Sequence, residues 1–194
     1  VDLWVSDNST ALSTYGEINT WNVSLITDMI QLFKDKTTFN DDIGNWDVSN
    51  VTTMERIFHQ AYSFNQDLST WDVSNVTTME RMFSQVTSYN QNLSTWDVSS
   101  VINMKEMFRY SYYFNQDLST WDVSSVTTME RMFQGAQTFK QDISGWDVSN
   151  VTNMDNMFDG ADALSDENKC SIHASFQTND IWTYDWCDQD CNGA

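Results

Sequence analysis

Apolar and polar positions along the chain repeat with a period of 25 residues. The stretch FNQDLSTWDVSNVTTMERMF, residues 64–83, returns almost letter for letter at residues 114–133. A fixed period of this length is typical of solenoids and other repeat arrays, in which one supersecondary unit stacks on the next. Six tryptophans mark the period without an insertion or deletion: Trp21, Trp46, Trp71, Trp96, Trp121 and Trp146.

The first half of each repeat predicts a strand. In DLSTWDVSN, residues 67–75, the apolar Trp71 and Val73 alternate with the polar Asp72. One such strand cannot bury its apolar face alone, but equivalent strands 25 residues apart can stack as a parallel sheet. We therefore expect six tryptophan-bearing strands side by side.

The second half of each repeat predicts a short helix. In VTTMERMFSQ, residues 76–85, Val76, Met79 and Phe83 have the spacing of one helical face. Thr77 followed three residues later by Glu80 fits a capping box. We expect the tryptophan, methionine and phenylalanine columns to form the core, where a column means equivalent residues of successive repeats.

The ends of such an array need covers, because terminal repeats expose an apolar face. We expect an N-terminal cap at residues 1–16, six repeats at residues 17–163 and a C-terminal cap with the cysteines at residues 164–194.

The net charge of the chain indicates which kinds of partner it can bind. The chain has 28 acidic residues and nine Lys and Arg, for a formal net charge of −19, which disfavours nucleic acid and anionic membranes. Cations and basic surfaces suit it better, although the charge also serves solubility. The sequence has no apolar run long enough for membrane insertion and no leader at Val1, so we expect any signal and anchor to be absent from this segment.

The opening YGEINTWNVS, the repeated WDVSNVTTMERMF and the closing ALSDENKCSIH resemble the BspA-like leucine-rich-repeat surface proteins, the mycoplasma-lipoprotein-type family with the 25-residue repeat. The resemblance extends from about Tyr15 to Trp186; the CDQDC motif after Trp186 departs from it. It implies an α/β repeat fold, a right-handed LRR-like solenoid of six turns with a parallel sheet on one side and short helices on the other. It also implies an extracellular or cell-surface location, roles in attachment or recognition, and no catalytic residues.

One carboxylate column is a candidate metal site. Stacking would bring like charges roughly 5 Å apart, which is costly unless something relieves the repulsion. Each carboxylate can accept hydrogen bonds from the backbone that follows it, as in an Asx turn. Calcium, which prefers oxygen ligands, is the alternative and the one cofactor considered. The column consists of Asp47, Asp72, Asp97, Asp122 and Asp147.

The five residues after each predicted helix vary most between repeats. They are unconstrained surface, or they form a contact patch where residue types that anchor interfaces gather. The candidate binding residues are His59, Tyr62, Arg109, Tyr110, Tyr112 and Tyr113.

The three cysteines, Cys170, Cys187 and Cys191, lie in the C-terminal cap. Such clustering predicts a disulfide between Cys170 and one of the other two in an oxidising compartment. With His173, the same residues are also of the types found in structural zinc sites.

Catalytic motifs are missing from the sequence, which has no phosphate-binding glycine loop, no H-E-x-x-H and no G-x-S-x-G. We therefore expect a non-catalytic extracellular or cell-surface binding or adhesion module that presents a rigid acidic surface to a protein or glycan. The alternative is a structural subunit or spacer that binds copies of itself, with or without calcium.

Overall fold

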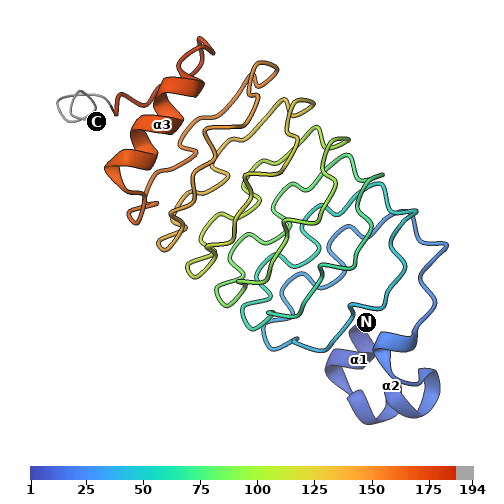
Figure 1. Cartoon of the computed structure of the whole chain (residues 1–194). Coiled ribbons are helices and arrows are strands. Elements are labelled where there is room, and N and C mark those ends of the chain that lie inside the picture. Colours follow the sequence, from blue (N-terminus) through green and yellow to red (C-terminus); the bar gives the residue numbers. More distant parts are fainter. Residues whose placement is uncertain (187–194) are drawn as a thin grey trace.

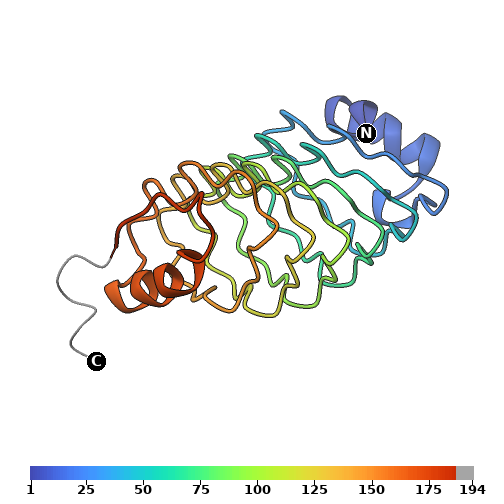
Figure 2. The ribbon, with the colours of Figure 1, turned by 90° about the horizontal axis from the view of Figure 1, so that it is seen from above.

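The computed structural model describes residues 1–186, which coil into a row of stacked turns with helices at both ends (Figures 1 and 2). The N-terminal helices are α1 (Asp2–Ser6) and α2 (Asn8–Tyr15), followed by the 3-10 helix η1 (Ile18–Thr20). Helix α3 (Asp166–Phe176) lies at the other end of the stack. The 25-residue period of the sequence is thus the period of the fold.

The predicted sheet of tryptophan-bearing strands is wrong. Trp71 N–H donates to the Leu68 carbonyl at 3.0 Å, and Val76 N–H donates to the Val73 carbonyl at 2.9 Å, so this segment forms β-turns. Serine and aspartate side chains favour such turns because they hydrogen-bond the nearby backbone. Strand pairing within residues 1–186 is limited to isolated parallel bridges in another column, formed by Asp28, Thr53, Thr78, Asn103, Thr128 and Asn153.

The predicted short helices of the repeats are also wrong. Met82 N–H donates to the Met79 carbonyl at 3.1 Å, and Val86 N–H donates to the Phe83 carbonyl at 3.0 Å. These contacts close β-turns whose third residues, Arg81 and Gln85, have φ angles of 54° and 62°. A positive φ at the third residue is the mark of a type II turn and interrupts a right-handed helix.

This backbone turns its N–H groups toward the next turn of the stack. Met79, Arg81, Phe83 and Gln85 donate to carbonyls of the following turn at 2.9, 2.9, 2.9 and 2.7 Å. The other four contacts between turns repeat the same set of four bonds. Each turn is therefore joined to its neighbour by main-chain bonds on alternate residues, without a regular sheet.

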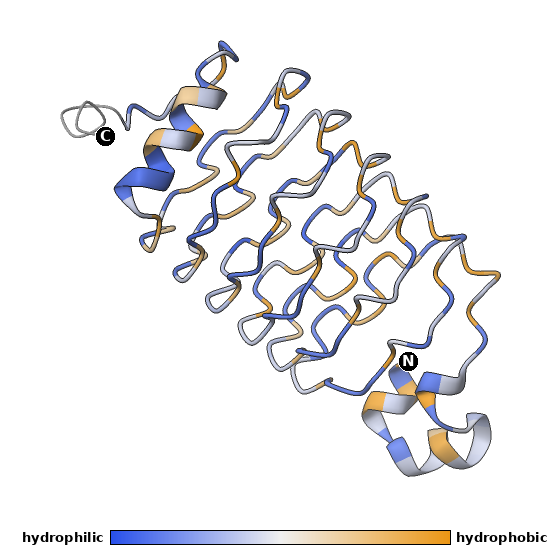
Figure 3. Ribbon diagram, viewed as in Figure 1, coloured by the Kyte–Doolittle hydropathy of each residue, from blue (hydrophilic) through white to orange (hydrophobic). Residues whose placement is uncertain are grey.

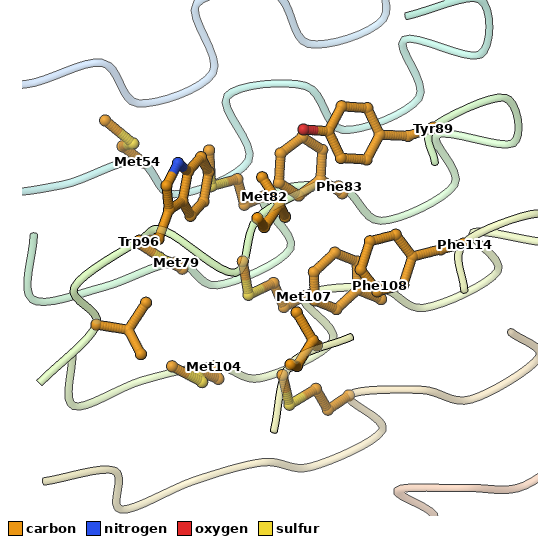
Figure 4. Packing of buried hydrophobic residues seen from close by; sticks show 14 of the residues in the cluster. Met54, Met79, Met82, Phe83, Tyr89, Trp96, Met104, Met107, Phe108 and Phe114 are labelled. Carbon is orange, nitrogen blue, oxygen red and sulfur yellow. The ribbon is translucent and has the colours of Figure 1, made fainter. Parts of the chain in front are cut away.

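The core consists of the predicted columns. The tryptophans from Trp46 to Trp146 are 3 % exposed, and the phenylalanines pile through the turns, with ring centroids 5.6 Å apart for Phe58 and Phe83 and 5.7 Å for Phe83 and Phe108. A second ring column packs beside the first, with Phe108 and Phe114 3.9 Å apart (Figure 4). Apolar and polar residues alternate within every turn, which leaves the polar ones for the surface (Figure 3).

Side-chain hydrogen bonds reinforce the stack at its polar edge. Asn40, Asn65 and Asn90 each use the side-chain oxygen to accept the backbone N–H of the residue 25 positions later, at 2.8 to 2.9 Å. Each tryptophan indole from Trp46 to Trp146 donates to a carbonyl of the preceding turn. These bonds satisfy backbone groups that a regular sheet would otherwise pair.

The two ends are covered differently. Trp4 of α1 is buried, contacts the Trp21 ring edge-to-face at 5.7 Å and donates to Asp41 Oδ2 at 3.0 Å. At the other end, the Tyr184 hydroxyl accepts the Phe158 N–H at 2.8 Å, and Phe176 of α3 is buried. The exact limits of the predicted caps, residues 1–16 and 164–194, stay a prediction.

Candidate binding surface

The strongest candidate is the segment Arg109 to Tyr113, here called the tyrosine ridge, which follows the buried Phe108. Tyr112 and Tyr113 are 38 % and 63 % exposed, whereas Ser111 between the ridge ends is buried and donates to the Phe83 carbonyl at 2.6 Å. The ridge is thus tied to the core through Ser111 and presents Tyr112 and Tyr113 to solvent.

Arg109 is held in place by its neighbours. Its Nε donates to Gln134 Oε1 at 2.8 Å, and its Nη1 donates to Glu106 Oε2 at 3.1 Å. The guanidinium carbon lies 4.7 Å from the centre of the Tyr110 ring, a cation–π distance. Arginine has five N–H donors, so these two bonds orient the group without using all of its hydrogen-bonding capacity.

Tyr110 lies against the next turn rather than pointing freely into solvent. A Cβ added at Gly135 would overlap the Tyr110 ring, and Gly135 has a φ of 70° that suits glycine. The Tyr110 and Tyr112 rings are 6.2 Å apart. The glycine therefore makes room for the Tyr110 ring, which lies against the next turn and is tilted by 57° from the Tyr112 ring.

The other two predicted binding residues lie two turns earlier in the stack. Tyr62 occupies the column of Tyr112 and is 40 % exposed, while His59 occupies the column of Arg109. His59 is half-buried, and burial lowers its imidazole pKa. Its Nδ1 is buried and has no hydrogen-bond partner in the part of the chain that the structure describes. The structure places these two residues in line with the ridge, with Ser84 and Thr87 of the intervening turn between them.

Sequence analysis missed a network of ion pairs beside the ridge, here called the charged ladder. Arg56 and Arg81 both contact Glu80, at 3.3 and 3.5 Å, so the network continues from turn to turn. One turn beyond the ridge, Arg131 lies 3.9 Å from Glu106 and 2.8 Å from Glu130. The ladder comprises Glu55, Arg56, Glu80, Arg81, Lys105, Glu106, Arg109, Glu130 and Arg131.

Glu106 is the centre of the ladder, with its side chain only 2 % exposed. Arg81 donates to both carboxylate oxygens at 2.9 Å, and Arg109 adds a third bond. Burial by itself raises the pKa of Glu106, but the bonds and charges of Arg81 and Arg109 outweigh burial and lower it to about 2. The sequence held one signal for this residue, since a glutamate stands in a column that is otherwise rich in arginine.

The aspartate column is hydrogen-bonded to its own backbone. In each case Oδ1 accepts the backbone N–H of the serine two residues later, at 3.0 to 3.1 Å, so the expected Asx-type role is confirmed. The serine hydroxyl bonds lower the pKa of Asp47 and of Asp97, although Asp122 opposes this at Asp97.

Calcium binding by these aspartates, Asp47, Asp72, Asp97, Asp122 and Asp147, stays a prediction. Among residues 1–186, no three His, Cys, Asp or Glu side chains gather in a group that could hold a metal ion. Cys187 and Cys191 lie outside the described residues, so the predicted disulfide and the zinc alternative stay predictions as well.

Comparison with known proteins identifies a family. The family model described as "Mycoplasma protein of unknown function, DUF285" matches residues 5–110 and again residues 86–182. No curated protein and no solved structure matches the chain. None of the helices in the described part of the chain is long and apolar enough to cross a bilayer. Because the two matches together span residues 5–182, the chain belongs to the DUF285 family.

Proposed function

We propose that the protein is a non-catalytic binding module of the cell surface that contacts a protein or glycan through the tyrosine ridge. The observation that carries the proposal is the exposure of Tyr112 and Tyr113 on a rigid stack. In the neighbouring turns the same columns hold small or polar residues, Thr87 and Ser88 on one side and Gln137 and Thr138 on the other.

Tyrosine suits such a contact because it offers a large amphipathic surface and few rotatable bonds to immobilise. The ridge adds an arginine whose orientation is already fixed by Gln134 and Glu106, so binding costs little ordering of this side chain. Aromatic residues and arginine are also the types that most often dominate interface energetics. The ridge therefore combines preorganisation with residues that anchor contacts.

The cell-surface location and the right-handed LRR-like class belong to the proposal. They rest on the repeated WDVSNVTTMERMF motif and its resemblance to BspA-like surface proteins. The net charge of −19 favours a neutral or basic partner over nucleic acid or an anionic membrane.

The test compares the chain with a variant that carries Tyr112→Thr and Tyr113→Ser on arrays of glycans and of extracellular proteins. Thr87 and Ser88 occupy these columns one turn earlier, so the repeat itself shows that the substitutions fit the fold. Tyr15→Ser removes a tyrosine that is 59 % exposed in α2 and serves as the matched control. We expect array signals from the chain and from the control that the double variant loses; signals shared by all three proteins would refute the ridge as the contact.

The second candidate is a structural subunit that associates with copies of itself, with or without calcium. Exposed apolar side chains in the first turn favour it, since Leu25, Ile26 and Ile30 are 87 %, 42 % and 43 % exposed. Light scattering over a hundredfold range of concentration tests this candidate: a rising mean mass supports it, and a constant monomer mass rules it out.

A further inference from the structure

Exposed tyrosines recur at one position of the repeat, two turns apart. Tyr62 and Tyr112 occupy the same column and are 40 % and 38 % exposed. The Tyr62 carbonyl accepts the Ser88 N–H of the next turn at 3.2 Å. The Tyr112 carbonyl accepts the equivalent Thr138 N–H, also at 3.2 Å. Because the main chain is held in the same way at both positions, the two side chains project from the stack at a fixed separation.

The rings of the core give this separation. In the column four residues before Tyr62, the rings on either side of Phe83 lie 5.6 and 5.7 Å from it. In the column two residues after Tyr62, the rings on either side of Tyr89 lie 5.9 and 6.4 Å from it. Since Tyr62 lies between these columns in the sequence, two turns of the stack separate it from Tyr112 by about 11 to 12 Å.

The tyrosine column and the column that follows it carry no charged residue over five successive turns, although the net charge of the chain is −19. Every one of these side chains has a hydroxyl or an amide group. Thr87 and Thr138 are half-buried and the others are exposed. The residues, here called the neutral strip, are Thr37, Thr38, Tyr62, Ser63, Thr87, Ser88, Tyr112, Tyr113, Gln137 and Thr138.

A neutral polysaccharide of β-1,4-linked pyranose sugars matches both features. Its hydroxyl groups lie around the edges of each sugar, where they can bond the hydroxyls and amides of the strip. C–H groups cover the two faces of each sugar, and such faces stack on aromatic rings, whose π faces are electron-rich. The chain is extended, and every second sugar has the same orientation. Two sugars advance by close to the separation of Tyr62 and Tyr112.

Other extended polymers match less well. Two residues of a β-strand advance by about 7 Å. One turn of a polyproline II helix advances by about 9 Å. Both distances are shorter than the separation of Tyr62 and Tyr112. Nucleic acid and acidic polysaccharides have the spacing of charged polymers, and the net charge of −19 repels them.

We propose that the neutral strip binds an extended, neutral β-1,4-linked polysaccharide that runs along the stack. One sugar stacks on Tyr62, the next lies over Thr87 and Ser88, and the third stacks on Tyr112. The polar side chains of the strip bond the sugar hydroxyls at the edges of the chain. This site rests on the proposed function, because it contains Tyr112 and Tyr113 of the tyrosine ridge and extends from them by two turns to Tyr62.

The test titrates oligosaccharides into the full chain by calorimetry. Cellohexaose and chitohexaose share the β-1,4 linkage and differ in whether the sugars are N-acetylated. Maltohexaose has the sugar of cellohexaose in an α-1,4 linkage that curves the chain. Cellobiose and chitobiose are too short to reach both tyrosines.

The chain variants are Tyr62→Thr and Tyr112→Thr, which introduce the residue that Thr87 shows to fit this column. Tyr15→Ser, which removes an exposed tyrosine of α2, is the control. Each variant is first shown to melt at the temperature of the parent chain.

We expect saturable binding of at least one β-1,4-linked hexaose to the parent chain and to the control. Binding should be at least about tenfold weaker for each of Tyr62→Thr and Tyr112→Thr and for the matching disaccharide, because one stacked sugar is lost. The hexaose that binds shows whether the natural partner is a plain or an N-acetylated glucan.

Equal affinity for maltohexaose would overturn the proposal, as would a loss confined to one tyrosine variant or no binding of either β-1,4-linked hexaose. A polyproline peptide that binds through both tyrosines would assign the strip to a protein instead. If neither hexaose binds while the arrays give ligands that the Tyr112→Thr, Tyr113→Ser variant loses, the polysaccharide is wrong and the proposed function stands. Array signals that this double variant keeps would refute both.

Discussion

The phenylalanine column of the core and the five-residue segment that follows each of these phenylalanines lie next to each other in the sequence. The two are nevertheless under different structural constraints. Phe83, Phe108 and Phe133 are fully buried and each ring stacks on its neighbours at 5.6 to 5.8 Å. The outer segments change from SQVTS at residues 84–88 to RYSYY at residues 109–113. A buried ring that contacts the rings of both adjacent turns cannot be substituted without disturbing them, whereas an outer residue can be substituted alone.

In a repeat protein, inner and outer positions carry different information about function. Identical inner positions report stacking, because close-packed interiors respond even to small changes in volume. Outer positions that depart from their own repeat cost the stack little and are free to serve a partner. By this reasoning we propose that recognition takes place at the tyrosine ridge and not at the regular aspartate column.

The largest expected effect on stability comes from removing one ring of the inner phenylalanine column. Phe108→Ala removes a ring that contacts Phe83, Phe114 and Phe133 and leaves a cavity in the middle of the stack. We expect a loss of about 3 to 5 kcal/mol in the free energy of unfolding, measured with urea. Tyr113→Ser at the surface is the control and should change it by less than about 0.5 kcal/mol. Similar losses of unfolding free energy for both variants would show that buried and outer positions are equally constrained, contrary to this expectation.

Glu106 should make the next largest contribution, and it should depend on pH. Its pKa falls from 4.5 to about 2 on folding, so the unfolded chain binds the proton more readily. The resulting stability is present above pH 4.5 and is lost as pH falls toward 2. A pKa difference of this size corresponds to about 3 kcal/mol.

The measurement is urea unfolding of the chain and of Glu106→Gln between pH 6 and pH 2. At pH 6 the variant should be less stable by about 3 kcal/mol, because Arg81, Arg109 and Arg131 lose their common carboxylate. The gap should narrow as pH falls through the window from 4.5 to 2. A gap that stays constant with pH would mean that the ladder's charges contribute nothing.

A smaller effect of opposite sign is expected at Tyr89. This residue stands in a phenylalanine column and is fully buried (Figure 4). Its hydroxyl has no hydrogen-bond partner among residues 1–186, and burial raises its pKa well above the ordinary value. Tyr89→Phe removes the unsatisfied hydroxyl and should stabilise the chain by about 1 kcal/mol. A calorimetric melting temperature that falls instead would show that the hydroxyl has a partner in solution.

The smallest expected effect is that of calcium. Since each aspartate of the column already accepts a backbone N–H, the melting temperature should be the same in EDTA and in millimolar calcium. A rise of several degrees would show that the carboxylates bind the ion, because a ligand specific for the folded state adds to its stability. Magnesium at equal concentration controls for ionic strength.

Much of the architecture could be predicted from the sequence, because a strict period leaves little freedom in how turns stack. Trp71, Met79 and Phe83 were assigned to the core, and all are buried. The local backbone could not be read in the same way. Apolar residues at helical spacing can point inward from a run of β-turns as well as from a helix. Arg81 and Gln85 are not residue types that indicate a positive φ, so the sequence did not reveal the turns.

Substitutions in two columns give structural information that the 25-residue period does not. Gly135 and Gly160 stand where earlier turns have Gln85 and Tyr110, and their positive φ values of 70° and 74° mark a left-handed position. Glu106 among arginines marked the ladder.

The most direct test of the central claim is a titration of a ligand from the array screen into the chain and into the Tyr112→Thr, Tyr113→Ser variant, with the melting temperature of both recorded beside it. We expect at least about tenfold weaker binding at an unchanged melting temperature, because the ridge anchors the proposed contact and contributes little to the stability of the stack. Undiminished affinity in the variant would contradict it and move the search for the contact away from the ridge.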